Sequence, residues 1–229
     1  MVKNPCYVSC LILFLSAVSV PSELAVVNAV PSESDAVRKL DLDPHLVGWW
    51  RFDETSGRTA ADSSGHGRSG TLKGNLSFDK CSVRGQAGSA LKFASGQDCV
   101  EITGYRGVTG TWPRTLTAWI KTTAPEGEIV SWGSDEYGKL WTFGFIRGRV
   151  GVTPKGGYLY MNAETHDDTW HHLAVVVEET ELPNLHDHVR LYKDGAPAEI
   201  HDIGLLDLWP IETGSDFDVR IGRGFRRGH

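Results

Sequence analysis

Apolar and polar residues alternate in short runs along this chain, and the densest run is Thr-Trp-His-His-Leu-Ala-Val-Val-Val at residues 169–177. Side chains on a strand point alternately to opposite faces, so His171 and His172 lie on different faces, each among apolar neighbours. Residues 189–193 form a second run, which ends in Asp194-Gly195, a dipeptide that accepts the positive φ angles of a type I′ turn. The pattern predicts a buried central strand, an adjoining hairpin and an antiparallel sheet.

Further short runs rich in β-branched and aromatic residues follow the same pattern, separated by Gly-containing turns. They span residues 46–52, 70–72, 90–93, 100–102, 116–121, 129–132, 139–146, 149–152 and 158–162. No helical period of useful length interrupts them after Asp43, and 26 Gly, 8 Trp and only 2 Met fit a turn-rich β protein. The predicted fold class is therefore all-β, a two-sheet antiparallel β-sandwich.

The N-terminal segment differs from the rest of the chain. Residues 11–20 form an apolar run that is too short to span a bilayer and follows a start with Lys3 and no acidic residue. This is typical of a secretory signal peptide, predicted over residues 1–29. Residues 30–45 are predicted as a linker or a short capping helix, and residues 46–229 as a single domain. We expect a secreted protein, extracellular or periplasmic, that does not span a membrane.

Four stretches carry a resemblance to a known family. They are Trp-His-His-Leu-Ala at 170–174 with Leu-Tyr-Lys-Asp-Gly at 191–195, Val-Gly-Trp-Trp-Arg-Phe-Asp at 47–53 with Asp-Ser-Ser-Gly at 62–65, Ala-Leu-Lys-Phe at 90–93 and Leu-Thr-Ala-Trp-Ile-Lys at 116–121. In this order they resemble the laminin-G-like jelly rolls of the concanavalin A-like lectin and glucanase superfamily. The resemblance covers nearly all of the chain after the predicted leader and implies a jelly-roll sandwich.

The resemblance also implies a final strand that this chain lacks. Members of the family usually end in a strand that pairs beside the first one, whereas this chain ends in a Gly- and Arg-rich segment at His229. We therefore expect a C-terminally incomplete domain in which the first strand, residues 46–52, has an open edge.

Charge argues against a nucleic-acid partner. The formal net charge is −6, and an acidic protein does not attract a polyanion. The one basic cluster, Arg220, Arg223, Arg226 and Arg227, lies in the Gly-rich tail and is predicted to be a solvated loop.

Cysteine pairing depends on the leader. Of the 4 Cys, Cys6 and Cys10 leave with the predicted signal peptide, so Cys81 and Cys99 remain as a pair. In an oxidising compartment they are expected to form a disulfide. The alternative is two unrelated thiols, because the sequence does not show whether their Cα atoms approach within bonding range.

Carboxylate spacing argues against catalysis. The superfamily that the chain resembles includes glycoside hydrolases with two carboxylates on one strand face. The nearest approach here is Glu179-Thr180-Glu181, and the Leu-Pro-Asn that follows breaks both the strand and the pattern. The chain also has no Gly-x-Ser-x-Gly nucleophile elbow. We therefore expect a protein that is not an enzyme.

Two loop carboxylates are candidates for a metal site. Asp53 and Asp62 lie in polar, Gly-containing loops, and hard cations such as Ca²⁺ prefer carboxylate and carbonyl oxygens. The family resemblance also implies a structural Ca²⁺. The alternative is that both carboxylates only accept hydrogen bonds from backbone N–H groups in their own turns.

Aromatic residues between Trp132 and Asn162 are candidates for sugar recognition, which uses aromatic faces for stacking with carboxylates or amides for the hydroxyl groups. The predicted ligand-binding residues are Asp135, Tyr137, Trp141, Tyr158, Tyr160 and Asn162. The alternative for each aromatic residue is a place in the core. A core position is least expected for Asp135 and Tyr137, because they lie in a predicted loop.

These observations predict a secreted, non-catalytic module that binds a polysaccharide or a cell-surface glycoconjugate. A protein-binding extracellular adhesion module is the first alternative, and a glycoside hydrolase-related domain of the same fold is the second. Aromatic residues with polar neighbours on a sheet face favour sugar, whereas a broad apolar patch at one rim favours a protein partner.

Overall fold

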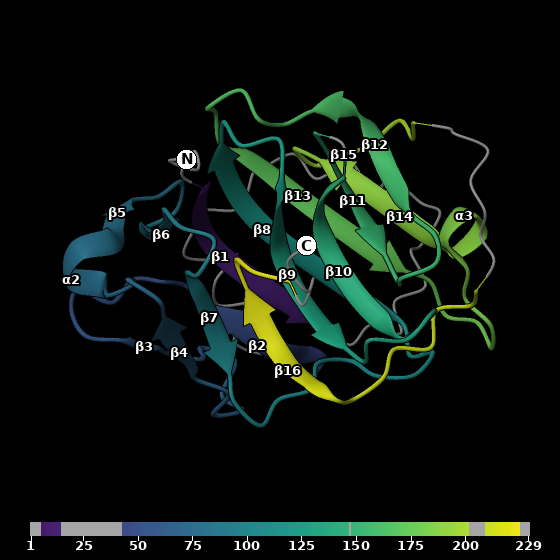
Figure 1. Ribbon diagram of the computed structural model, residues 1–229, viewed down its shortest axis with the longest axis horizontal. Coiled ribbons are helices and arrows are strands. Elements are labelled where there is room, and N and C mark those ends of the chain that lie inside the picture. Colours follow the sequence, from purple (N-terminus) through teal and green to yellow (C-terminus); the bar gives the residue numbers. More distant parts are fainter. Residues whose placement is uncertain (1–5, 15–42, 147, 202–208, 225–229) are drawn as a thin grey trace.

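The structure, a computed structural model, describes residues 6–14, 43–146, 148–201 and 209–224. These residues form two antiparallel β-sheets that pack face to face (Figure 1), so the predicted all-β sandwich is confirmed. Two short helices, α2 (Phe78–Cys81) and α3 (Leu185–His188), lie outside the sheets. No helix among the described residues combines the length and the apolar character needed to cross a membrane.

The first sheet contains the hairpin that the sequence predicted. Its order is β15 (Ala196–Pro197), β14 (Val189–Lys193), β13 (His171–Val177), β8 (Arg114–Thr122), β1 (Cys6–Phe14), β6 (Ser89–Phe93) and β5 (Ser82–Arg84), and β2 (Leu46–Trp50) also pairs with β1. Strand β13 is central, because it pairs with β14 on one side and β8 on the other. The turn after β14 has positive φ at both Asp194 (53°) and Gly195 (82°), as the Asp-Gly dipeptide predicted.

The second sheet has the order β12 (Leu159–Glu164), β11 (Arg149–Thr153), β10 (Leu140–Ile146), β9 (Gly127–Gly133), β16 (Phe217–Ile221), β7 (Cys99–Ile102), β4 (Gly70–Lys73) and β3 (Thr59–Ala60). Strand β16 was not predicted. It lies between β9 and β7, and its Arg220 pairs with Glu101 of β7 at 2.9 Å. The prediction of a solvated loop was therefore wrong for Arg220, because the side chain is held by a cross-strand carboxylate. Arg226 and Arg227 lie outside the described residues.

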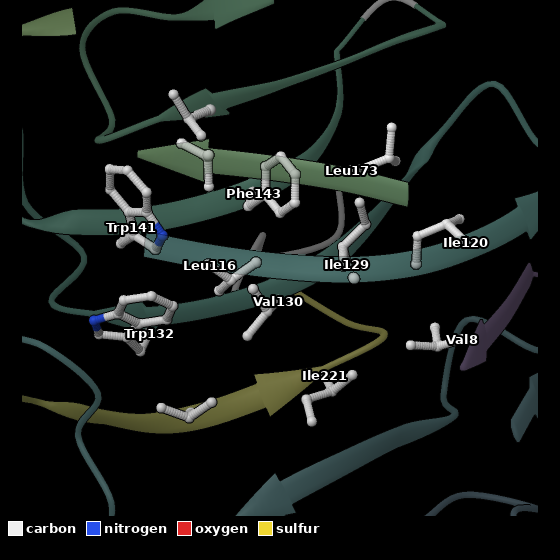
Figure 2. Close-up of a cluster of buried hydrophobic side chains, with 14 of the residues drawn as sticks. Val8, Leu116, Ile120, Ile129, Val130, Trp132, Trp141, Phe143, Leu173 and Ile221 are labelled. Carbon is white, nitrogen blue, oxygen red and sulfur yellow. The ribbon is translucent and has the colours of Figure 1, made fainter. Parts of the chain in front are cut away.

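The core fills the space between the sheets (Figure 2). Leu116 and Ile120 of β8 and Leu173 of β13 face the aromatic side chains Trp141 and Phe143 of β10, and all of them are buried. Strand β8 alternates strictly between buried and half-buried residues, as a strand with one core face should. Burial of each large apolar side chain contributes about 1.5–3 kcal/mol, so these rows hold the two sheets together.

Strand β1 comes from the segment predicted to be a signal peptide. It lies between β8 on one side and β6 and β2 on the other, as the purple strand in Figure 1 shows. Strand β2 therefore has a partner where the sequence predicted an open edge. Residues 15–42, which include the rest of the predicted leader and most of the segment predicted as a linker or a short capping helix, lie outside the described residues. Removal of the leader stays a prediction.

The predicted disulfide is absent from the structure, in which Cys81 and Cys99 are both free thiols. Cys99 is buried in β7, and burial raises the pKa of its thiol. Cys81 ends helix α2, and its thiol lies 3.9 Å from the carbonyl oxygen of Asn75. Each cysteine is thus held by its own element, which corresponds to the alternative of two unrelated thiols.

Candidate functional site

Four large apolar side chains are exposed among the described residues, and all of them lie in loops. They are Trp112, Tyr137, Leu182 and Trp209. Backbone hydrogen bonds join these loops through residues 209–213: Ile211 donates to Pro183, Glu212 donates to Gly138, and Thr213 exchanges two bonds with Gly110. We call this surface the loop rim.

Tyr137 and Trp209 form an aromatic pair at the loop rim, which we call the exposed stack. Their ring centroids are 5.7 Å apart and the rings are nearly parallel, at 14°. Offset stacking of this kind is favourable for aromatic pairs. Tyr137 is 60% exposed and Trp209 is 46% exposed, so the pair offers aromatic surface to solvent.

A glycine makes room for the exposed stack. A Cβ atom on Gly156 would lie 2.5 Å from Trp209 Cδ1 and 2.8 Å from Tyr137 Cδ1, and its φ is +105°. Both the close approach and the backbone conformation require glycine here. The stack therefore rests on the turn between β11 and β12.

Charged groups flank the exposed stack. Lys155 donates to both the carboxylate (2.6 Å) and the backbone carbonyl (2.8 Å) of Asp135. The Lys155 ammonium also lies 5.5 Å from the centre of the Tyr137 ring. These contacts tie the loop that carries Tyr137 to the β11–β12 turn, and they place hydrogen-bonding groups beside an aromatic surface.

A second aromatic row runs along β12. Tyr158 and Tyr160 stack at 5.5 Å, and Tyr160 stacks on His201 at 5.2 Å. Tyr160 is only 1% exposed, so its ring supports its neighbours and does not face solvent. Asn162 is exposed at the end of the row, 3.2 Å from His201 Nδ1 and 3.4 Å from Glu199 Oε2.

Trp141 is a core residue. It is 0% exposed and packs with Trp132 at 5.9 Å between the sheets. Its place on the inner face of β10 excludes it from a surface site, and this prediction was wrong for that reason. The structure brings together Asp135 and Tyr137, and it places Tyr158, Tyr160 and Asn162 in the separate row.

Trp209 was missed by the sequence analysis. It lies outside every predicted strand and directly before Pro210. Proline restricts the preceding residue to extended conformations and is common in surface turns. An aromatic residue beside a proline in such a segment was the available signal, but its partner across the fold could not be inferred from it.

The two predicted calcium ligands accept hydrogen bonds from different partners. Asp53 accepts hydrogen bonds from Arg51 and from Ser89 N–H. Asp62 accepts from the backbone N–H groups of Trp49, Ser64 and Arg68.

Burial by itself would raise the pKa of the Asp62 carboxyl, but hydrogen bonds from Ser64, Arg68 and Trp49 lower it overall. Asp62 thus makes the backbone turn contacts that were the alternative, whereas Asp53 accepts from the Arg51 side chain and from Ser89 N–H, which is distant in the chain. Among the described residues, no group of three or more His, Cys, Asp or Glu side chains is arranged to hold a metal ion.

A buried histidine lies between two carboxylates at the end of β13, and we call this group the histidine clamp. His171 Nδ1 is 2.8 Å from Asp194, and Nε2 is 3.2 Å from Asp167. Hydrogen bonds from Thr169, then from His171, lower the pKa of Asp167. Burial opposes the shift at Asp194, but hydrogen bonds from His171 and His172 N–H lower its pKa as well. The clamp joins the loop before β13 to the turn after β14.

No protein-family model matches the chain, and no curated protein sequence matches it either. The β-sandwich topology is compatible with many families, since one fold supports many functions. The side chains of the loop rim are therefore the features that indicate a function.

Proposed function

We propose that this protein is a secreted, non-catalytic module that binds carbohydrate, either a polysaccharide or a cell-surface glycoconjugate, through the exposed stack. The observation that carries the proposal is the solvent-facing pair of Tyr137 and Trp209, with Asp135 and Lys155 beside it. The pair is held in place by Gly156 and by backbone hydrogen bonds, so it is organised before a ligand arrives.

The chemistry of the exposed stack suits a sugar ring. One face of a pyranose presents C–H groups, which pack on an aromatic surface, while its equatorial hydroxyl groups reach outward. The Asp135 carboxylate can accept hydrogen bonds from hydroxyl groups, and the Lys155 ammonium can donate them. Such a shallow site exchanges water contacts for sugar contacts, so each hydrogen bond adds little net free energy and the affinity is modest.

The loop rim also supports the second candidate, a protein-binding adhesion module. Trp112 is 63% exposed and Leu182 is 67% exposed, and both lie on loops joined to the segment that carries Trp209. Exposed aromatic residues are enriched at the centres of protein interfaces. A partner protein would contact Trp112 and Leu182 as well as the exposed stack, whereas a sugar unit needs the stack alone.

Several parts of the proposal come from the sequence. The predicted signal peptide supports secretion, and the four stretches that resemble laminin-G-like jelly rolls support that fold. A role for Ca²⁺ at Asp53 or Asp62 stays a prediction. In the part of the chain that the structure describes, the carboxyl groups with clearly shifted pKa values, Asp62, Asp98, Glu101, Asp167 and Asp194, are all shifted downward. A glycosidase acid needs a raised pKa, so none of these five supports the hydrolase alternative.

The test is a glycan array with three proteins: the wild type, a variant with Tyr137→Ala and Trp209→Ala, and Trp112→Ala as the matched control. The double variant should lose affinity for the bound glycan class by about tenfold or more, because each aromatic contact contributes on the order of 1 kcal/mol. Trp112→Ala removes an exposed indole outside the stack and should bind as the wild type does. A chelator arm tests the Ca²⁺ prediction.

Circular dichroism and melting curves must first show that all three proteins are folded. Equal binding by the double variant and the wild type would refute a site at the exposed stack. An array without binding, combined with a partner protein whose capture requires Trp112 and Leu182, would establish the adhesion function instead.

A further inference from the structure

Strand β1 fills a slot with two walls. On one side it pairs with β8 over its whole length, from Cys6 opposite Thr122 to Phe14 opposite Thr115. On the other side it pairs first with β6, from Cys6 to Val8, and then with β2, from Leu11 to Phe14. The occupant of this slot therefore completes hydrogen bonding for three other strands at once.

The strand that occupies the slot connects β2 to the rest of the sheet. Strand β2 has no strand partner other than β1 among the described residues. Cleavage after Ala29, which the sequence predicts, would remove β1 and leave the facing edges of β8, β6 and β2 unpaired. Unpaired edges next to a core recruit another strand.

The inner side of the slot demands apolar residues at alternate positions. Val8 is 1% exposed and lies opposite the buried residues Ile120 and Leu91. Cys6 is half-buried and packs against the same core, and burial raises the pKa of its thiol to about 12. A polar side chain in place of Val8 would lose its water without gaining a partner.

The outer side of the slot favours a negative charge at one position. Tyr7 lies directly opposite Lys92 on β6 and Lys121 on β8. The Lys92 ammonium is 5.8 Å from the Tyr7 ring, and Lys121 pairs with Asp168 at 3.7 Å. Opposite charges in directly paired positions of neighbouring strands stabilise a sheet. A carboxylate in place of Tyr7 would have a lysine on each side.

The slot is open at its Cys6 end. A pocket of about 440 Å³ lies there, and the residues that line it include Cys6, Phe93, Thr122, Glu126 and Arg223. Because Cys6, Phe93 and Thr122 are the first paired residues of the slot, an occupant longer than β1 can continue into this pocket.

We propose that the slot is a strand-acceptor site for another polypeptide. Once the leader is removed, the site takes an extended segment of about nine residues that runs antiparallel to β8, β6 and β2. The segment has apolar residues at the positions of Cys6 and Val8 and an acidic residue at the position of Tyr7. This inference goes beyond carbohydrate binding and depends on the predicted removal of the leader.

The test uses the full chain with a specific protease site placed between residues 30 and 42. After folding, cleavage there converts β1 into a bound peptide that can exchange. A labelled peptide of residues 5–15 with a solubilising tail is then added, and its binding is followed by fluorescence anisotropy. Cleaved protein should take up the peptide, whereas uncut protein, whose own β1 stays tethered, should not.

Peptide variants test the chemistry of the slot. Tyr7→Glu should bind about two- to fivefold more tightly at low salt, as expected for favourable cross-strand charge pairs. The preference should disappear in protein carrying Lys92→Ala and Lys121→Ala. Val8→Asp is the matched control for the inner face and should reduce binding by more than tenfold.

Absence of uptake by the cleaved protein, or equal uptake by cut and uncut protein, would overturn the proposal. Uptake without a preference for Glu at position 7 would overturn the acidic requirement. If the cleaved protein instead loses its peptide and elutes as a dimer, the slot belongs to a second copy of this chain and a foreign donor is excluded. None of these measurements uses a glycan, so failure here leaves the carbohydrate proposal to its own test.

Discussion

Arg114 connects the core to the loop rim, and its replacement should be among the most destabilising single changes in this fold. The side chain is 0% exposed. It donates to the carbonyl oxygens of Val108 (2.7 Å), Gly110 (3.0 Å) and Trp112 (3.2 Å), and to the hydroxyl of Thr213 at 2.8 Å. One guanidinium therefore holds the loop of Trp112 and the segment of Thr213 in one arrangement.

The expected magnitude follows from two opposing effects. Each hydrogen bond to a charged donor contributes about 1.5–3 kcal/mol, so the four acceptors together gain about 6–12 kcal/mol. Burial of the charge costs several kcal/mol, and burial lowers the pKa of Arg114 to about 9, which leaves it protonated at neutral pH. The net loss expected for Arg114→Met is about 3–5 kcal/mol, because buried carbonyl oxygens then lose their hydrogen-bond donor.

Urea unfolding at pH 7 measures this loss. For a chain of this size, 3–5 kcal/mol corresponds to a drop in Tm of about 6–20 °C. Arg114→Lys should lie between the wild type and Arg114→Met, because an ammonium has three donors and cannot match the planar fork. Arg106→Met is the control: Arg106 is an exposed arginine on the same loop, paired with Asp218 at 3.3 Å, and should cost less than about 1 kcal/mol.

A loss below about 1 kcal/mol for Arg114→Met, with an unchanged denaturant slope, would refute the reasoning. It would mean that the desolvation cost of the guanidinium cancels its four hydrogen bonds. Hydrogen exchange at residues 105–113 offers a second readout, since these amides should lose protection before the sheets do if Arg114 holds the loop.

The histidine clamp should make stability fall in acid. Asp167 and Asp194 have folded-state pKa values below the usual value of 3.8, so their contribution to the free energy of unfolding is present above about pH 4 and is lost as pH falls through the lower, folded-state values. Asp194→Asn should therefore reduce the change of the urea midpoint between pH 4 and pH 2. An unchanged pH profile in this variant would contradict the prediction. Gly156→Val should lower the free energy of unfolding by about 1–3 kcal/mol through overpacking against the exposed stack, and it should shift the tryptophan fluorescence. Emission and stability equal to those of the wild type would show that the stack tolerates a side chain there. Thiol titration of denatured, unreduced protein should find that Cys81 and Cys99 both react. If neither reacts, the two cysteines form the disulfide that the sequence predicted.

Local patterns in the sequence determined where the strands run. The density of β-branched and aromatic residues located β13, the two-residue alternation located β8, and the Asp194-Gly195 dipeptide predicted the turn with two positive φ angles. These features depend on residues close together in the chain, so they were predictable. The same reasoning placed Tyr137 in a loop, where it is exposed.

The packing of the two sheets decided whether each aromatic side chain is buried or exposed. Trp141 and Tyr137 were both predicted as ligand-binding residues, yet one is in the core and the other is on the loop rim. Which residues of β10 face inward depends on the opposing sheet, whose residues are distant in sequence. Trp209 likewise became part of a site only because its segment lies beside the loop of Tyr137, 72 positions earlier in the numbering.

The sequence also did not predict which strands lie next to each other in the sheets. The last described strand, β16, alternates apolar and polar residues over Phe217–Ile221, but its place between β9 and β7 depends on strands that are distant in sequence. The segment of β1 has the apolar composition of a leader, and the same composition suits a buried strand. Composition determined that this segment avoids water, while the unpaired edges of β8, β6 and β2 determined where it lies, because a buried edge must pair its backbone hydrogen-bonding groups.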